Sequence, residues 1–302
     1  MELVPIQPER IGQTDYAAEL YEHLEKGNIL LLRQTPFAPT EDDAAFLRGQ
    51  HQAETKIHKN IAYKTPLDKL TGAQNETPED AERLKRIMKA YAHGALQFLA
   101  NLLPAYAKAW KVDYASFRPF EEQGRDLPLS RRNDLMHVDA FPTRPTHGGR
   151  ILRLFTNISP DRDRVWVTAG PFDQLAQRYA KEAGLGKVTG LTATLQRTGA
   201  YVTRLVGVRA DVPSPYDQFM MGFHHFLKAN ENFQKNERLF TFHFPPGSSW
   251  ICFTDQIAHA VTSGQYALEQ TCIVPRSAMQ HPEWAPVAVL ERLAGKTLAP
   301  SA

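Results

Sequence analysis

Apolar residues recur at helical spacing in one long segment of the chain and alternate over short runs in most of the rest. The apolar positions on one face of the long segment are Met88, Tyr91, Ala92, Ala95, Leu96 and Leu99. Before them, the run Thr77-Pro78-Glu79-Asp80 supplies a capping residue, a proline at the first helical position and an acid at the third. The pattern predicts a helix from 78 to about 103 that packs one face on the protein.

After about Phe117 the chain changes to short apolar runs broken by proline and glycine. The strands predicted there are 135–141, 150–158, 164–167, 191–196, 200–210, 239–244, 249–254 and 267–274. Helices are predicted at about 171–183 and 214–229, the second opened by Ser214-Pro215-Tyr216-Asp217 in capping-box order. Short strands at this spacing are typical of a sandwich or a barrel.

The first 76 residues have a weaker pattern of mixed elements. It predicts an apolar strand at 28–32, a helix from Thr40 and a polar loop from His58 to Pro66. With no repeat and no clear linker, we expect one α+β domain over 1–302. Within it, 1–116 is expected to be mainly helical and packed on a β core at 117–280, followed by a C-terminal tail at 281–302.

Composition excludes several classes of protein. Apolar residues make up 42% and charged residues 23%, values typical of a globular protein. The net charge is only +2 and the Lys and Arg residues are spread along the chain, which argues against nucleic acid as a partner. The two cysteines cannot form a zinc cluster. Neither a signal-peptide apolar segment nor an uninterrupted run of 18 apolar residues is present, so we expect a cytoplasmic protein.

Three residues form a candidate metal site. His137 and Asp139 are two apart in a predicted strand, so their side chains point to the same face. His259 follows much later, beyond the Pro245-Pro246-Gly247 turn and a predicted strand. Two imidazoles and a carboxylate on one face of an octahedral ion suit Fe(II) and leave positions for a 2-oxoacid and O2. A histidine and an aspartate two apart also occur by chance; the order of motif, strands and distal histidine favours the metal interpretation.

The other histidines have simpler interpretations. His224 and His225 are adjacent on a predicted helix and point in different directions, so packing or solvent contact is preferred for them over joint metal binding. The chain has neither an HExxH motif nor paired CxxC motifs, which argues against a zinc hydrolase.

Residues 130–159, SRRNDLMHVDAFPTRPTHGGRILRLFTNIS, resemble the core of the Kdo 3-hydroxylases, and the resemblance extends through 217–234 and 244–271. These enzymes are Fe(II)- and 2-oxoglutarate-dependent dioxygenases that act on the Kdo sugar of Kdo2-lipid A. The resemblance implies a double-stranded β-helix, a jelly-roll or cupin-like core wrapped by helices, with His137, Asp139 and His259 as the iron ligands. It also implies O2-dependent hydroxylation at C3 of Kdo, which gives the Ko sugar of lipopolysaccharide.

A cation must receive the far carboxylate of 2-oxoglutarate, and the planar fork of arginine suits it. Many related dioxygenases place this arginine on the strand after the distal histidine, where this chain has Glu269 to Ile273 without a cation. Other branches place it on the strand after the HxD motif. We therefore prefer Arg153, which lies in an apolar run, then Arg276 and then Arg150. A structural salt bridge is the alternative for each.

Polar and cationic side chains that flank the metal motif, or lie in the loop from His58 to Lys64, could bind the acidic sugar and the phosphates of the lipid. The candidates are Arg131, Arg132, Arg144, His147, His58, Lys59, Tyr63 and Lys64. Each residue taken singly fits a solvated surface position equally well.

Two rival functions stay open. One is a metal-dependent cupin-like isomerase or hydrolase, and the other is a non-catalytic sugar- or lipid-binding module. A lipid substrate implies peripheral attachment to the inner face of the inner membrane; a Leu96, Leu99, Leu102, Leu103 face could touch lipid, although core packing is the preferred interpretation. The sequence predicts neither the oligomeric state nor which Kdo unit is modified.

Overall fold

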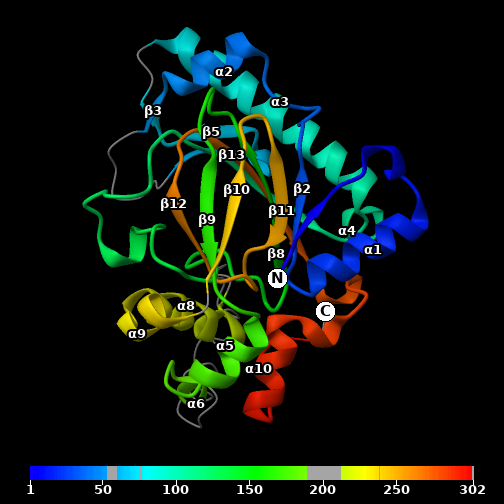
Figure 1. Ribbon diagram of the computed structural model, residues 1–302, viewed down its shortest axis with the longest axis vertical. Helices are drawn as coiled ribbons and strands as arrows, with labels where there is room; N and C mark the ends of the chain where they lie inside the picture. The colour runs from blue at the N-terminus through cyan, green and yellow to red at the C-terminus, as the bar shows by residue number, and fades with distance from the viewer. Residues whose placement is uncertain (53–59, 75–76, 189–211, 238, 301–302) are drawn as a thin grey trace, which may run out of the picture.

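Two β-sheets face each other across the centre of the molecule in the computed structural model (Figure 1). The structure describes residues 1–52, 60–74, 77–188, 212–237 and 239–300. The larger sheet has eight strands in the order β1 (Leu3–Pro5), β2 (Ile29–Leu32), β11 (Ser249–Phe253), β8 (Arg150–Asn157), β13 (Ala267–Val274), β7 (Lys111–Arg118), β4 (Ile61–Lys64) and β5 (Lys69–Thr71).

The smaller sheet has the strand order β10 (Phe240–Phe244), β9 (Arg164–Thr168), β12 (His259–Ser263), all antiparallel. A third pair, β3 (His51–Gln52) with β6 (Ala73–Gln74), lies apart from both sheets. The segment around His137 joins the free side of β12 through an isolated antiparallel bridge to His259. This arrangement brings the HxD motif to the edge of the smaller sheet.

Helices cover the large sheet on its outer side and close one end of the molecule. Those on the outer side are α1 (Thr14–Glu25), α3 (Pro78–Leu102) and α4 (Pro104–Ala107), with α2 (Glu41–Arg48) beyond the end of α3 (Figure 1). Those at the end of the molecule are α5 (Phe172–Tyr179), α6 (Leu185–Val188), α8 (Pro215–Ala229), α9 (Glu231–Asn236) and α10 (Pro286–Ala294) (Figure 1). Short 3-10 turns are Pro8–Arg10, Thr65–Leu67, Leu129–Arg131, Arg276–Ala278 and Pro282–Trp284.

Strand alternation separates the core from the site. On β8, Leu152 and Leu154 pack outward in the cluster shared with α1 and α3, while Phe155 packs inward against Trp166 of the smaller sheet. Arg153 lies on the inward side with Phe155. The inner space between the sheets therefore receives both aromatic and charged side chains, and its charged part becomes the site.

The expected α+β class with a jelly-roll core is confirmed, and the long helix begins at Pro78 with the Thr77 side chain accepting a hydrogen bond from the Asp80 N–H. Helix α8 begins with the complete capping box of Ser214 and Asp217. The face of α3 that could have met lipid is packed in the core, with Leu99 and Leu102 fully buried. In the described part of the chain, no helix is both long and apolar enough to span a membrane.

Several local predictions are wrong or lie outside the described residues. The strand expected at 135–141 is an irregular segment with one bridge, because its neighbour β12 is short and the backbone N–H of Asp139 donates to the carbonyl of Thr254, which lies outside β12. The polar loop expected at 58–66 contains strand β4 instead, and β12 was not predicted. The strands expected at 191–196 and 200–210 fall outside the described residues.

Candidate active site

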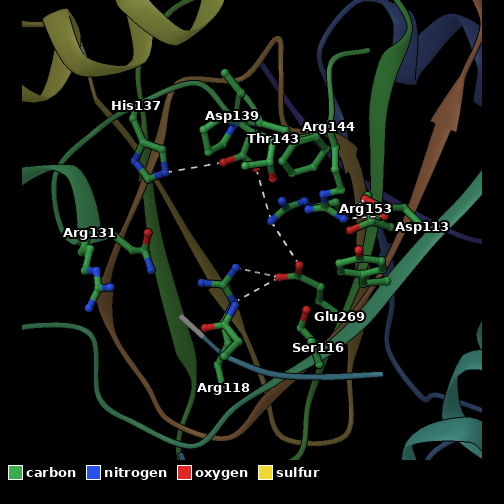
Figure 2. Close-up of a pocket in the computed structure, with 18 of the residues that line it drawn as sticks. Asp113, Ser116, Arg118, Arg131, His137, Asp139, Thr143, Arg144, Arg153 and Glu269 are labelled. Atoms are coloured by element: carbon green, nitrogen blue, oxygen red, sulfur yellow. Dashed lines mark hydrogen bonds and ion pairs between the residues drawn. The ribbon is translucent and has the colours of Figure 1, made fainter. Parts of the chain in front are cut away.

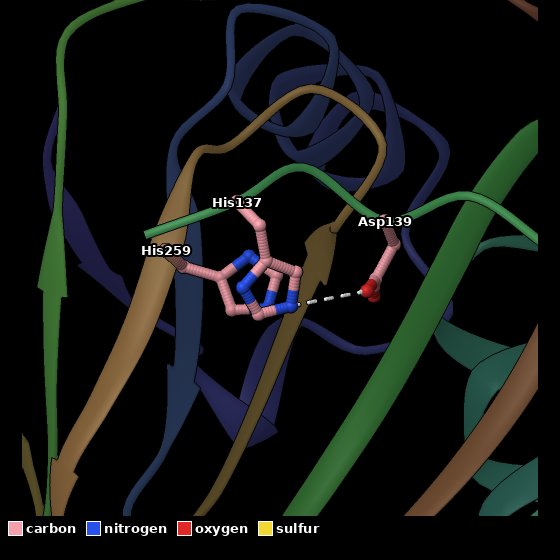
Figure 3. Close-up of side chains that lie close together, drawn as sticks. All are labelled: His137, Asp139 and His259. Carbon is pink, nitrogen blue, oxygen red and sulfur yellow. Dashed lines mark ion pairs between the residues drawn. The ribbon is translucent and has the colours of Figure 1, made fainter. Parts of the chain in front are cut away.

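His137 and His259 sit directly opposite each other in the antiparallel bridge. The His137 N–H donates to the His259 carbonyl at 3.0 Å, and the His259 N–H donates back at 2.9 Å. Residues opposed in this way carry their side chains on the same face, and the two ring centroids are 4.9 Å apart. With Asp139 they offer one ligand atom each, all within 4.8 Å of one another (Figure 3).

Backbone contacts fix the protonation of both imidazoles. The Nδ1 of His137 donates to the Leu135 carbonyl at 2.7 Å, and the Nδ1 of His259 donates to the Ile257 carbonyl at 2.8 Å, because a carbonyl oxygen can only accept. Burial lowers the pKa of both rings below the ordinary value, and nearby Lys228 lowers the pKa of His137 further. Each Nε2 therefore keeps the lone pair that a metal needs.

Asp139 supplies an ionised carboxylate. Its Oδ1 lies 3.6 Å from His137 Nε2, and its Oδ2 makes no hydrogen bond with the described residues although the Nη1 of Arg153 is 3.3 Å away. Burial alone would raise the pKa of Asp139, but Arg153, His259 and His137 outweigh it, so the pKa falls far below the ordinary value. Two neutral imidazoles and one carboxylate are the donor set that suits Fe(II), so the residues present fit an iron site.

A cavity of about 1390 Å³ opens beside His137 and Asp139. Among the described residues, seven Lys and Arg side chains line it: Lys64, Arg118, Arg125, Arg131, Arg144, Arg153 and Lys228. Three acids of the described part of the chain share this wall, Asp113, Asp139 and Glu269. The excess of cations suits an anionic substrate.

A smaller cavity lies between the two sheets, next to His137, Asp139 and His259. Three arginines line it, Arg118 of β7, Arg153 of β8 and Arg164 of β9. Arg118 donates to Glu269 from Nε at 3.0 Å and Nη2 at 2.8 Å, and Arg153 Nη1 lies 3.2 Å from the same carboxylate, so a chain of charges runs from Arg118 to Asp139 (Figure 2). Trp166 stacks on His259 at 4.6 Å and forms part of the wall.

Arg164 is the least compensated of these arginines. It is 1% exposed, its Nη1 donates to the Gly264 carbonyl at 2.9 Å, and the carboxylate of Glu122 is 3.9 Å away. Its Nε makes no hydrogen bond with the described residues. Burial lowers the pKa of Arg164 to about 10, with Glu122 opposing that shift and Arg118 adding to it. An anion in the smaller cavity would offset this charge.

Of the three arginines expected to anchor 2-oxoglutarate, only Arg153 lines a cavity beside the metal ligands. Arg150 is fully buried in an ion pair with Asp255 at 2.7 Å. Arg276 pairs with Glu291 at 3.0 Å. Both arginines pair with acids away from the two cavities, so the prediction that either one anchors 2-oxoglutarate is wrong.

Only some of the residues expected to bind the substrate line the large cavity. Arg131, Arg144 and Lys64 line the large cavity, whereas Tyr63, next to Lys64 on β4, points to the opposite face and is buried against α3. Arg132, which pairs with Asp134, and His147, which faces Asp217, do not line it. His58 and Lys59 lie outside the described residues.

Other cavity residues were missed by the sequence analysis. His224, His225 and Lys228 of α8 line the large cavity, and His224 packs edge-on to His137 at 4.8 Å. Their spacing on the predicted helix places these three residues on one side of it. The spacing does not show that this side faces the metal ligands. Arg118 ends β7 and Arg164 begins β9, so neither lies inside an apolar run as Arg153 does, and the sequence gives no comparable signal for them.

Comparisons with known proteins agree with this geometry. The family model for 3-deoxy-D-manno-oct-2-ulosonic acid (Kdo) hydroxylase matches residues 8–297. The apo structure of the Kdo hydroxylase KdoO, described as a non-haem Fe(II) α-ketoglutarate-dependent dioxygenase, is 31% identical, with a TM-score of 0.84 and coverage of 100% of this chain and 99% of that one. No curated protein sequence matched the chain.

Two further KdoO structures carry ligands. The complex with α-ketoglutarate and Fe(III) is 30% identical, covers 100% of this chain and 99% of its own, and has a TM-score of 0.83. The cobalt(II) complex is 31% identical, covers 99% and 98%, and has a TM-score of 0.83. Because the family model spans nearly the whole sequence, the chain belongs to the Kdo hydroxylase family.

Proposed function

We propose that this protein is an Fe(II)- and 2-oxoglutarate-dependent dioxygenase that hydroxylates C3 of Kdo in Kdo2-lipid A and so forms the Ko sugar. The observation that carries the proposal is the cluster of His137, Asp139 and His259, the first two of which line a basic cavity, in a chain of the Kdo hydroxylase family. Kdo is a carboxylate and lipid A carries phosphates, so the charge of the cavity matches the substrate.

His137, Asp139 and His259 would hold the iron through the two Nε2 atoms and the carboxylate. Bound iron, together with 2-oxoglutarate and O2, supplies the oxidation that replaces a C–H bond of the sugar by C–OH, with succinate and CO2 as the other products. The chain positions the sugar and limits the access of water. The buried Trp166 and the carbonyl contacts of both imidazoles hold the ligand side chains in one orientation.

Arg153 is our choice for the far carboxylate of 2-oxoglutarate, with Arg164 as the second candidate. Both line the smaller cavity beside the metal ligands. Arg153 already faces Asp139 and Glu269, whereas Arg164 has an under-compensated charge deeper between the sheets. A dicarboxylate that spans this cavity would contact one or both guanidiniums.

The cations nearer the outer part of the cavity would bind the acidic groups of the lipid. Arg131 and Lys64 line the cavity, and Arg144 is held between the rings of Tyr114 and Phe141 at 4.2 and 4.3 Å. We expect the protein to meet its lipid at the inner face of the inner membrane as a peripheral protein. Sedimentation with liposomes containing Kdo2-lipid A, compared with liposomes lacking it, tests this attachment.

Product analysis tests the reaction. Kdo2-lipid A is incubated with the protein, Fe(II), ascorbate and 2-oxoglutarate, and the acid sugars are then released and identified by mass spectrometry. The proposal predicts Ko in place of Kdo, with uptake of O2 tied to consumption of 2-oxoglutarate. Oxygen at another carbon would contradict the C3 assignment, and conversion without O2 would favour the isomerase or hydrolase alternative.

A further inference from the structure

Helix α8 turns one row of side chains toward the large cavity. Met221, His224, His225 and Lys228 all line it, and their spacing of three, four and seven residues from Met221 places them on one helix face. The other face, which includes Phe219 and Phe223, is buried in the cluster shared with α5 and α10. One face of the helix therefore packs in the core while the opposite face contributes to the cavity wall.

Two contacts fix α8 relative to the metal ligands. The Nδ1 of His224 donates to the Val138 carbonyl at 2.8 Å, between His137 and Asp139 in sequence. The side-chain amide of Gln234 in α9 bonds the Met136 N–H at 3.0 Å, the Met136 carbonyl at 2.9 Å and the Leu227 carbonyl of α8 at 2.8 Å. These hydrogen bonds hold α8 to the backbone on both sides of His137. They therefore also fix the position of Lys228, which lies one helical turn after His224.

Lys228 places a buried positive charge in this part of the wall. The residue is only 3% exposed, although lysine is rarely buried to this extent. Among charged groups it has the largest effect in lowering the pKa of His137, and it also lowers the pKa of His224. Lys228 lies one helical turn after His224, whose ring packs edge-on to His137 at 4.8 Å, so its charge lies on the His137 side of the site, whereas Arg153 lies beside Asp139.

The chemistry of Kdo limits where its carboxylate can bind. C1 is the carboxylate carbon, C2 is the anomeric carbon and C3 is the methylene, so C1 lies two C–C bonds, about 2.5 Å, from C3. When C3 is placed for reaction, the carboxylate must also be close to the metal ligands. Arg153 faces Asp139 and Glu269 and lines the inner cavity, whereas Lys228 lines the large cavity from the helix whose His224 packs on His137.

We propose that Lys228 binds the C1 carboxylate of Kdo and so selects C3 as the carbon that faces the metal site. The proposal rests on the proposed function and adds a substrate-recognition residue to it. His224 supports this role by fixing α8 on the Val138 carbonyl. Lys228 acts by binding and orientation, and no proton or electron passes through it.

The test compares natural Kdo2-lipid A with a form whose Kdo carboxylates have been converted to carboxamides. Wild-type protein should convert the carboxamide about 10- to 100-fold less efficiently, because a charge-assisted hydrogen bond is lost. Lys228→Met should lose a similar factor on natural lipid and discriminate little between the two forms. Lys235→Met, which removes an exposed lysine of α9, is the control and should behave as wild type.

Binding of Fe(II) and 2-oxoglutarate without lipid, followed by visible absorption, separates folding from recognition. Lys228→Met should keep this binding; if it does not, Lys228→Gln is tested in its place, and loss in both variants would make Lys228 a structural residue and overturn the proposal. Retention of full discrimination by a variant that binds iron would overturn it as well. Wild-type protein that converts neither lipid form would instead refute the proposed function.

Discussion

Arg153 and Asp139 face each other across the boundary between the two cavities, with Arg153 Nη1 3.3 Å from Asp139 Oδ2. The same Nη1 lies 3.2 Å from Glu269, so one guanidinium faces both a metal-ligand carboxylate and a structural one. The arrangement keeps Asp139 ionised before metal binds, since Arg153 is the strongest of the groups that lower its pKa. It also places a planar cation beside the proposed 2-oxoglutarate pocket.

Replacement of Arg153 by lysine should weaken 2-oxoglutarate binding while the charge near Asp139 is kept. Lysine cannot make the two parallel hydrogen bonds of a guanidinium, so we expect the KM for 2-oxoglutarate to rise about 10- to 100-fold with little change in the KM for lipid. Succinate formation at varied 2-oxoglutarate concentration measures this. Arg276→Lys, remote from both cavities, serves as the control.

Arg164→Lys distinguishes the two candidates for the far carboxylate. If Arg153 is the main anchor, the effect of Arg164→Lys on the KM for 2-oxoglutarate should be the smaller of the two. A large effect at Arg164 with none at Arg153 would transfer the role to Arg164, whose charge is compensated least.

Metal removal should lower the stability of the folded protein. A ligand held at 100 times its dissociation constant stabilises the native state by about 2.7 kcal/mol, provided it does not bind the unfolded chain. Denaturant unfolding with Co(II) and with a chelator should therefore differ by about this amount. Asp139→Asn, which removes the charged ligand, should unfold at nearly the same denaturant concentration in both conditions; an equal metal effect in this variant would argue against Asp139 as a ligand.

Leu99→Ala tests whether the apolar face of α3 is core. Leu99 is fully buried in the cluster between α3 and the large sheet, so the substitution should reduce the free energy of unfolding by about 2 to 5 kcal/mol. Leu67→Ala, at a residue that is 67% exposed, should change it by less than about 0.5 kcal/mol. Equal small effects would mean that α3 does not pack as described.

Both cysteines should be unreactive in the native protein. Burial raises the pKa of Cys252 and of Cys272 well above the ordinary value for a thiol, so almost no thiolate exists at pH 8. Iodoacetamide should label neither thiol in the folded state and both after denaturation, as counted by intact mass. Rapid labelling of Cys252 in native protein would show that the inner face of β11 is open to solvent.

The sequence predicted the parts of the site that depend on local spacing. His137 and Asp139 are two residues apart, and their convergence needs only an extended backbone. The capping runs at Thr77 and Ser214 likewise predicted the starts of α3 and α8 from neighbouring residues. His259 required the fold of the whole core and was assigned from the order of motifs and from the family resemblance.

Residues brought together by strand pairing could not be predicted. Arg118, Arg153 and Arg164 come from β7, β8 and β9, and their shared cavity depends on the register of β13 between β7 and β8 and on the packing of the two sheets. The faces of Tyr63 and Lys64 could not be predicted either. A shift of one residue in the register of β4 would turn Tyr63 from the core to the cavity and Lys64 from the cavity to the core.

Anaerobic visible absorption of the protein with Fe(II) and 2-oxoglutarate tests the central claim most directly. Wild-type protein should develop a metal-to-ligand band on addition of 2-oxoglutarate, and His137→Ala and His259→Ala should not, because each loses one of the two neutral imidazole ligands. His243→Ala, which alters an exposed histidine of β10, should keep the band. Absence of the band from iron-loaded wild-type protein, or its full retention in His259→Ala, would contradict the account.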